Sequence, residues 1–243
     1  RIQLDANEWG GEGGVLGYER YPDPQPAALR AAYARHLGVA GSGLFLGRGA
    51  DEAIDVLLRT FCDANRDAIL VTPPTYGYYA VAAAIQGAAV VEAPLVGDNF
   101  DLDEDAIVQT VREGVKLVFI CSPNNPTGNG FAPERLSILG RRLEGRALLV
   151  IDEAYGELSS LPSLAPEAVR RENIIVLRTL SKALGHAGVR LGAAVANPEI
   201  IQWMQKVRAP YPLSSPQVRV GLDALASFCL LYTSPSPRDA TLS

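Results

Sequence analysis

From Leu44 onward, the chain alternates short apolar runs with longer segments in which apolar residues recur at helical spacing. The short runs are typical of buried strands, and the segments between them are typical of amphipathic helices. This alternation predicts an α/β protein with a mostly parallel seven-stranded sheet and helices on both faces. The predicted strands span 44–49, 68–74, 89–94, 116–123, 147–155, 174–181 and 190–197.

Helices are predicted between these strands, and several of them open with proline or an acidic residue, as helix starts often do. A further helical run passes through Val220 and Leu225, and His36 lies in another helical stretch. The predicted starts lie near Asp51, Tyr76, Asp103, Pro133, Pro166 and Pro198.

Composition narrows the range of ligands. The 243 residues carry a net charge of −5 without any block of like charge, so we expect neither nucleic acid nor an anionic membrane as a partner. No stretch reaches the roughly 18 consecutive apolar residues that a membrane span needs. The three cysteines lie far apart, which favours neither a disulfide framework nor a metal site. We therefore expect a soluble, cytoplasmic protein that binds small molecules and no metal.

Polar and glycine-rich motifs directly follow the apolar runs: GRGADE, PPTYG, SPNNPTG, DEAY and TLSKALGHAGVR. Ligands of open α/β sheets bind at the carboxyl ends of the parallel strands, so these motifs are expected to share one crevice. A single NPTG would more often be an ordinary turn, but five motifs in this position favour a binding site. WGGEGG follows no apolar strand and is interpreted as a loop, not as a dinucleotide motif.

The order of SPNNPTG, DEAY and SK, with an arginine eight residues beyond the lysine, resembles the fold-type I aminotransferases that use pyridoxal phosphate. RYPDPQP, GRGADEAIDVLLRTFC, TPPTYGYY, LRTLSKALGHAGVRLG and APYPLS narrow the resemblance to the histidinol-phosphate aminotransferase family over about 2–226. The resemblance implies pyridoxal 5′-phosphate as cofactor and the large domain of that fold. It also implies amino-group transfer between L-histidinol phosphate and 2-oxoglutarate, yielding glutamate, in histidine biosynthesis.

By this resemblance, Lys182 is the catalytic residue, which holds the cofactor as a Schiff base and, when freed, moves the substrate's α-proton. Asp152 ends an apolar run, where a buried carboxylate needs a cation, and the resemblance places it against the protonated pyridine nitrogen. Tyr155 and Asn125 would contact the ring hydroxyl oxygen, and Tyr76 would stack on the ring. The alternatives are a solvated lysine for Lys182, a helix N-cap for Asp152 and a core tyrosine for Tyr76.

GRGADE also predicts a phosphate site, because the unpaired N–H groups and the dipole at a helix N-terminus attract anions. The amides of Ala50 and Asp51 would point at the phosphate oxygens, although Asp51 could equally be only a helix cap. Thr179 and Ser181 offer hydroxyls, and Arg190 offers a forked guanidinium suited to paired contacts.

Two assignments rest wholly on the resemblance. Tyr21 would reach the phosphate bound by a neighbouring subunit, which implies a homodimer with shared sites. Asn7 would lie on the substrate side of the site.

The resemblance also implies a chain truncated at both ends. Residues 1–40 would form an N-terminal segment that belongs to a small domain and to subunit contacts, and 41–213 would form the large cofactor-binding domain. Residues 214–227 would begin the connection to a C-terminal domain that is largely missing. The stretch 228–243 is rich in Ser, Thr and Pro and is expected to be a non-native tail.

Other functions stay open at this point. Aromatic aminotransferases and a threonine-phosphate decarboxylase share the lysine and the aspartate but differ in substrate or in later chemistry. A cofactor-sensing regulatory domain would carry a DNA-binding module or a basic face, and this sequence has neither. An inactive fragment is the remaining alternative, because substrate choice in the family depends partly on arginines of the missing region.

Overall fold

The computed structural model describes residues 6–8 and 18–231, with side chains up to residue 227. All seven predicted strands are present, and they form one sheet in the order β1-β7-β6-β5-β4-β2-β3. The strands are β1 (Leu44–Gly47), β2 (Ala68–Val71), β3 (Ala89–Glu92), β4 (Val115–Cys121), β5 (Leu148–Asp152), β6 (Ile174–Thr179) and β7 (Gly192–Val195).

The sheet is mostly parallel, as the apolar pattern predicted. Strands β2 to β6 pair in parallel with their neighbours, whereas β7 pairs antiparallel with both β6 and β1. Because β7 runs the other way, its first residues lie at the sheet edge where the parallel strands end. A residue just before β7 can therefore join the strand-end motifs of the parallel strands.

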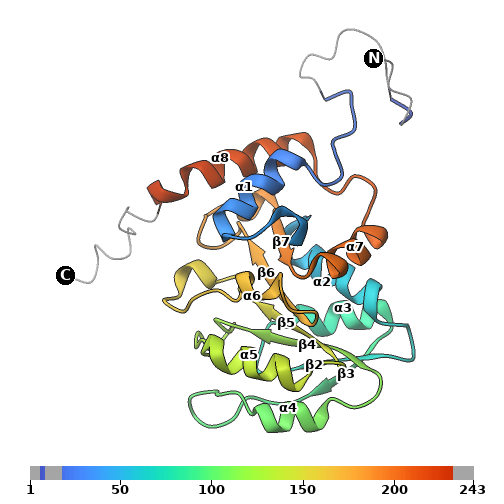
Figure 1. Ribbon diagram of the computed structural model, residues 1–243, viewed down its shortest axis with the longest axis vertical. Coiled ribbons are helices and arrows are strands. Elements are labelled where there is room, and N and C mark those ends of the chain that lie inside the picture. The colour runs from blue at the N-terminus through green and yellow to red at the C-terminus, as the bar shows by residue number, and fades with distance from the viewer. Residues whose placement is uncertain (1–5, 9–17, 232–243) are drawn as a thin grey trace, which may run out of the picture.

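Helices cover both faces of the sheet, and all six predicted starts fall within two residues of an observed helix start. In Figure 1, α5 and α6 lie on the left of the sheet, and α2, α3 and α7 lie on the right. The helices are α1 (Ala27–Leu37), α2 (Gly49–Phe61), α3 (Tyr78–Gln86), α4 (Glu104–Thr110), α5 (Pro133–Arg142), α6 (Ala165–Ala168), α7 (Pro198–Val207) and α8 (Ser215–Leu231).

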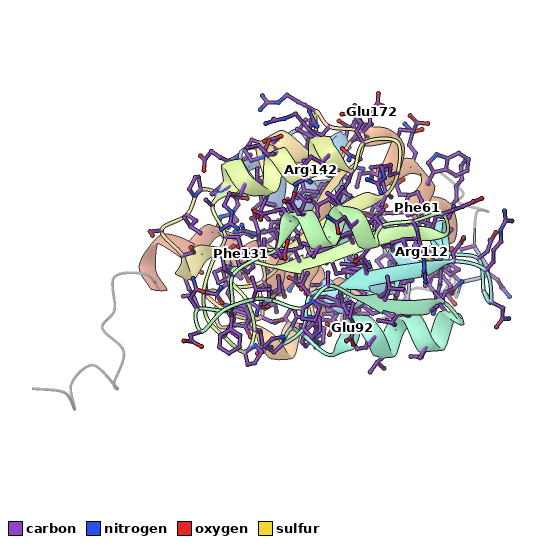
Figure 2. All side chains as sticks on the ribbon, turned by 90° about the horizontal axis from the view of Figure 1, so that it is seen from below. Phe61, Glu92, Arg112, Phe131, Arg142 and Glu172 are labelled. Carbon is purple, nitrogen blue, oxygen red and sulfur yellow. The ribbon has the colours of Figure 1, made fainter. Side chains whose placement is uncertain are left out.

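Alternate side chains of each strand fill two separate cores. In β5, Leu149 and Ile151 pack with residues of α1, α4, α5, α6 and α8, while Val150 packs with residues of α2, α3 and α7. The period of two that separates the strand faces produces this division. Side chains fill the space between the sheet and the helices, as the view from below shows (Figure 2).

The first and last described helices pack together. Helices α1 and α8 lie side by side (Figure 1), and Leu29, Tyr33 and Ala224 belong to the same core as the strands. The divisions predicted at 40 and 213 stay predictions. The predicted tail begins within α8, whose backbone continues to Leu231, and the rest of it, 232–243, lies outside the described residues. Within the described part of the chain, no helix has the length and apolar character of a membrane span.

The order of the strands in the sheet predicts where a binding crevice lies. Strand β3 lies on one side of the adjacent pair β2 and β4, and β5 lies on the other, so the connections out of β2 and out of β4 run in opposite directions. Ligands of doubly wound sheets bind where the strand order reverses in this way, at the carboxyl ends of the strands. The motifs PPTYG and SPNNPTG follow β2 and β4 and therefore face each other at this point.

Candidate active site

A pocket opens at the carboxyl ends of the parallel strands. It brings together the predicted cofactor residues of one subunit from five separate stretches of sequence, and Cys121 and Ala154 complete its lining. Tyr21 and Asn7 do not line it. The predicted residues in the lining are Ala50, Asp51, Tyr76, Asn125, Asp152, Tyr155, Thr179, Ser181, Lys182 and Arg190.

Asp152, the last residue of β5, is a buried carboxylate that accepts two hydrogen bonds. Its Oδ2 accepts from the Tyr79 hydroxyl at 2.8 Å, and its Oδ1 accepts from the Ala154 N–H at 3.0 Å. No lysine or arginine of the described residues forms an ion pair with it. Burial raises the pKa of Asp152 to about 6, although both hydrogen bonds lower it.

The alternative interpretation of Asp152 as a helix N-cap is wrong. The helical turn that follows begins at Gly156, and Tyr155 occupies its cap position. Asp152 instead closes a tight turn onto Ala154 and presents its carboxylate to the pocket.

Lys182 lies in the bend that follows β6. Its Nζ is 5.2 Å from the centre of the Tyr155 ring, and both side chains line the pocket. The lysine is exposed and lines the pocket, so its amine is accessible to a ligand. A primary amine and a buried carboxylate therefore face the same space.

Arg190, Thr179, Ser181 and the start of α2 converge on the pocket and form a cradle of N–H and hydroxyl groups. Arg190 Nη1 lies 3.3 Å from Ser181 Oγ, and its Nη2 forms an ion pair with Asp51 Oδ2 at 3.0 Å. Thr179 Oγ1 lies 2.9 Å from Ser181 Oγ, so the hydroxyls and the guanidinium converge. Helix α2 begins at Gly49, and its first N–H groups have no partner within the helix.

The interpretation of Asp51 as only a helix cap is wrong, since Arg48 occupies the cap position and Asp51 lies inside the first turn. Its carboxylate accepts from the Tyr76 hydroxyl at 3.2 Å and from Arg190. Burial and the nearby Asp51 raise the pKa of Tyr76 to about 12, so its hydroxyl stays neutral near pH 7. Asp51 therefore holds an aromatic wall and a cation of the pocket at once.

Two glycines permit the close contacts of the cradle. Gly49 has a φ of +83°, and a Cβ there would lie 2.8 Å from Arg190 Nη2. A Cβ at Gly192 would lie 2.5 Å from both Gly49 C and Ala50 N. Gly49 belongs to the GRGADE motif that the sequence singled out, whereas nothing in the sequence singled out Gly192, because its contact with α2 arises only in the folded sheet.

Further polar residues behind the pocket were missed. Asn124 is buried; its Oδ1 accepts from Thr75 Oγ1 at 3.0 Å, and its Nδ2 donates to Pro74 O at 2.9 Å. It therefore joins the PPTYG and SPNNPTG loops. The signal was present, since Asn124 stands in the same motif as Asn125.

Arg178 is the second missed polar anchor. It is buried on β6 and forms ion pairs with Glu153 at 2.7 Å and Glu157 at 2.5 Å. Glu153 also accepts from the Leu164 N–H at 2.9 Å. These contacts connect β6, which leads to Lys182, with the loop that follows Asp152. One buried cluster of ion pairs therefore holds together the two segments that carry Lys182 and Asp152.

The fold and the site define an α/β protein with a polar pocket at the carboxyl ends of its parallel strands. Residues 16–230 match the profile of the family described as "Aminotransferase class I and II". The chain belongs to this family.

Among curated proteins, the chain is similar to histidinol-phosphate aminotransferases. It is 44% identical to those of Xanthomonas campestris pv. campestris and Stenotrophomonas maltophilia, over 96% of this chain. It spans 66% of the length of these relatives.

A solved structure shows the same fold. Histidinol-phosphate aminotransferase from Sinorhizobium meliloti, in complex with pyridoxal-5′-phosphate, superposes with a TM-score of 0.81 at 30% identity. The match covers 88% of this chain and 59% of that one. This likeness agrees with the fold-type I architecture that the motif order predicted.

Proposed function

We propose that the chain is the cofactor-binding part of a pyridoxal-phosphate-dependent aminotransferase that acts on L-histidinol phosphate and 2-oxoglutarate in histidine biosynthesis. The observation that carries this proposal is the combination of groups in one pocket: a buried carboxylate without a cation, a lysine amine and the cradle of N–H and hydroxyl groups. The names of the curated relatives support the substrate.

The residues of the pocket fit this cofactor. The buried Asp152 carboxylate has no cation among the described residues, and a protonated ring nitrogen would supply one. Arg190, Ser181 and the first amides of α2 would hold the phosphate. Lys182 Nζ would bond to the aldehyde carbon.

When bound, the cofactor supplies an aldehyde that exchanges with amines and a ring that withdraws electrons from the carbon losing its proton. Asp152 would hold the proton on the ring nitrogen. Lys182 Nζ would take the α-proton of the substrate and return it at a neighbouring carbon. Tyr155 and Asn125 would donate hydrogen bonds to the ring hydroxyl oxygen, and Tyr76 would cover one ring face.

A homodimer is part of the proposal. Tyr21 is 54% exposed and stacks on Tyr211, with ring centres 4.3 Å apart, and it does not line the pocket of its own subunit. It would reach the phosphate held by a second copy, while Asn7 would lie on the substrate side. Sedimentation velocity tests the dimer, and a monomer at micromolar concentration would contradict it.

Reductive labelling tests the attachment site. The chain is incubated with pyridoxal phosphate, reduced with borohydride and digested, and the label is expected on the peptide that contains Lys182. The Lys182→Arg variant should stay unlabelled, whereas Lys206→Arg, a change of a surface lysine packed over Trp203, should label normally. A label on any other lysine would contradict the proposal.

The substrate preference is tested on a chain extended to the full length of its relatives. In a chimera, the C-terminal third of the Xanthomonas campestris relative follows residue 227, and 2-oxoglutarate is the acceptor. Histidinol phosphate is expected to give a higher kcat/KM than phenylalanine or threonine phosphate. Preference for phenylalanine would indicate an aromatic aminotransferase, and release of carbon dioxide from threonine phosphate would indicate a decarboxylase.

A further inference from the structure

Tyr79, in the first turn of α3, lies directly behind the pocket. Its side chain is fully buried, and its hydroxyl donates to Asp152 Oδ2 at 2.8 Å. Since the Ala154 N–H binds the other oxygen, both oxygens of the Asp152 carboxylate are held by protein donors. The carboxylate thus has a fixed orientation before any ligand arrives.

The ring of Tyr79 is held as firmly as its hydroxyl. It stacks on Phe119 with ring centres 4.7 Å apart and an interplanar angle of 16°. The Tyr76 ring meets it edge-on, with ring centres 5.5 Å apart and an interplanar angle of 87°. Tyr76 lines the pocket, so one buried tyrosine supports both the carboxylate and the aromatic wall.

The surroundings of Asp152 oppose its ionisation, and the hydrogen bond from the Tyr79 hydroxyl favours it. Burial dominates and raises the pKa of Asp152, the hydrogen bonds from Tyr79 and Ala154 lower it, and the carboxylates of Asp51 and Glu153 raise it further. On the neighbouring strand, the Cys121 thiol has a pKa raised to about 12 by burial, so it adds no charge near pH 7. Burial also raises the pKa of Tyr79, which keeps its hydroxyl a donor.

We propose that Tyr79 is a positioning residue that keeps Asp152 ionised and aimed at the ring nitrogen of the cofactor. The inference rests on the proposed function. Tyr79 acts through Asp152 and does not line the pocket. Its removal should therefore weaken cofactor binding only as long as residue 152 is an aspartate.

The first test needs no cofactor. The pKa of the Asp152 carboxyl is measured by ¹³C NMR of the chain labelled at aspartate Cγ, with Asp152→Asn to assign the signal. Tyr79→Phe is expected to make Asp152 a roughly tenfold weaker acid, because a hydrogen bond to the ionised form is lost. Tyr33→Phe is the matched control, since Tyr33 is equally buried and its hydroxyl has no hydrogen-bond partner among the described residues.

The second test is a double-mutant cycle on pyridoxal-phosphate affinity. Tyr79→Phe should weaken binding about tenfold in the parent chain and less than twofold in the Asp152→Asn background. A merely structural role would lower affinity equally in both backgrounds, and that result would overturn the proposal. Failure of the parent to bind the cofactor would refute the proposed function, and the carboxyl pKa would still test whether Tyr79 favours the ionised form.

If Tyr79→Phe does not fold, 3-fluorotyrosine placed at position 79 keeps the ring and makes the hydroxyl a stronger donor. Asp152 is then expected to become a stronger acid than in the parent. An unchanged Asp152 pKa, in this variant or in a folded Tyr79→Phe, would overturn the proposal.

Discussion

Asp152→Asn should stabilise the ligand-free chain at neutral pH while abolishing the proposed transamination. Burial raises the pKa of Asp152 from 3.8 to about 6 in the folded chain. Each tenfold change in acid strength is worth about 1.4 kcal/mol, so ionising this carboxyl costs the folded state about 3 kcal/mol. The neutral amide avoids this cost and keeps nearly the same shape.

The sign of the pH dependence follows from the raised pKa. Below pH 3.8, the carboxyl is protonated in the folded and the unfolded chain, and the stabilisation by the retained proton is complete. Between 3.8 and about 6, the unfolded chain releases its proton first, so the free energy of unfolding of the parent falls. Above about 6 the loss is complete, and Asp152→Asn shows no such loss.

Urea unfolding of both chains between pH 4.5 and 8, followed by circular dichroism, measures this difference. The advantage of Asp152→Asn should grow by about 2 kcal/mol over that range, whatever constant offset the amide introduces. Tyr33→Phe serves as a control with no pH-dependent difference. A constant difference across the range would refute the claim that burial without a cation dominates this site.

Two further pairs of substitutions, each a test with its control, probe the scaffold. Arg178→Met removes the cation from a buried ionic cluster and should lower the free energy of unfolding by about 3 to 5 kcal/mol, whereas Arg66→Met, at the exposed pair with Asp63, should cost less than about 1 kcal/mol. Gly192→Ala should cost about 1 to 3 kcal/mol and weaken cofactor binding, because its Cβ would lie 2.5 Å from Ala50 N. Gly188→Ala, with nothing within 4 Å, should change stability by less than about 0.5 kcal/mol. Urea titration measures all four, and equal costs within either pair would contradict the reasoning.

The strands and helices could be predicted because buried strands and amphipathic helices leave distinct periods in the sequence. The start of α3 shows that the period locates a helix boundary only to within about two residues. The prediction placed it near Tyr76, but the helix begins at Tyr78. Tyr76 lies in the loop before α3 and donates to Asp51, a tertiary contact that no local period records.

The candidate site could be predicted as far as strand ends identify it. The rule that ligands bind at the carboxyl ends of parallel strands selects the motifs there. It does not select residues such as Tyr79, which contact pocket residues without lining the pocket themselves. Tyr79 and Asp152 are 73 positions apart, and in the sequence Tyr79 is one more tyrosine in an apolar stretch. Gly192 and Ala50 meet only because β7 lies beside β1, which the order of strands along the chain does not reveal.

The structure also distinguishes the two adjacent carboxylates of DEAY, which the sequence separates only by resemblance. Successive side chains at the end of β5 point to opposite faces of the sheet. Glu153 therefore meets Arg178, whereas Asp152 meets the Tyr79 hydroxyl. Among the described residues, Glu153 is paired with a buried cation, whereas Asp152 has hydrogen bonds alone. A cationic ring nitrogen entering the pocket would gain far more from Asp152, so charge compensation makes it the better partner.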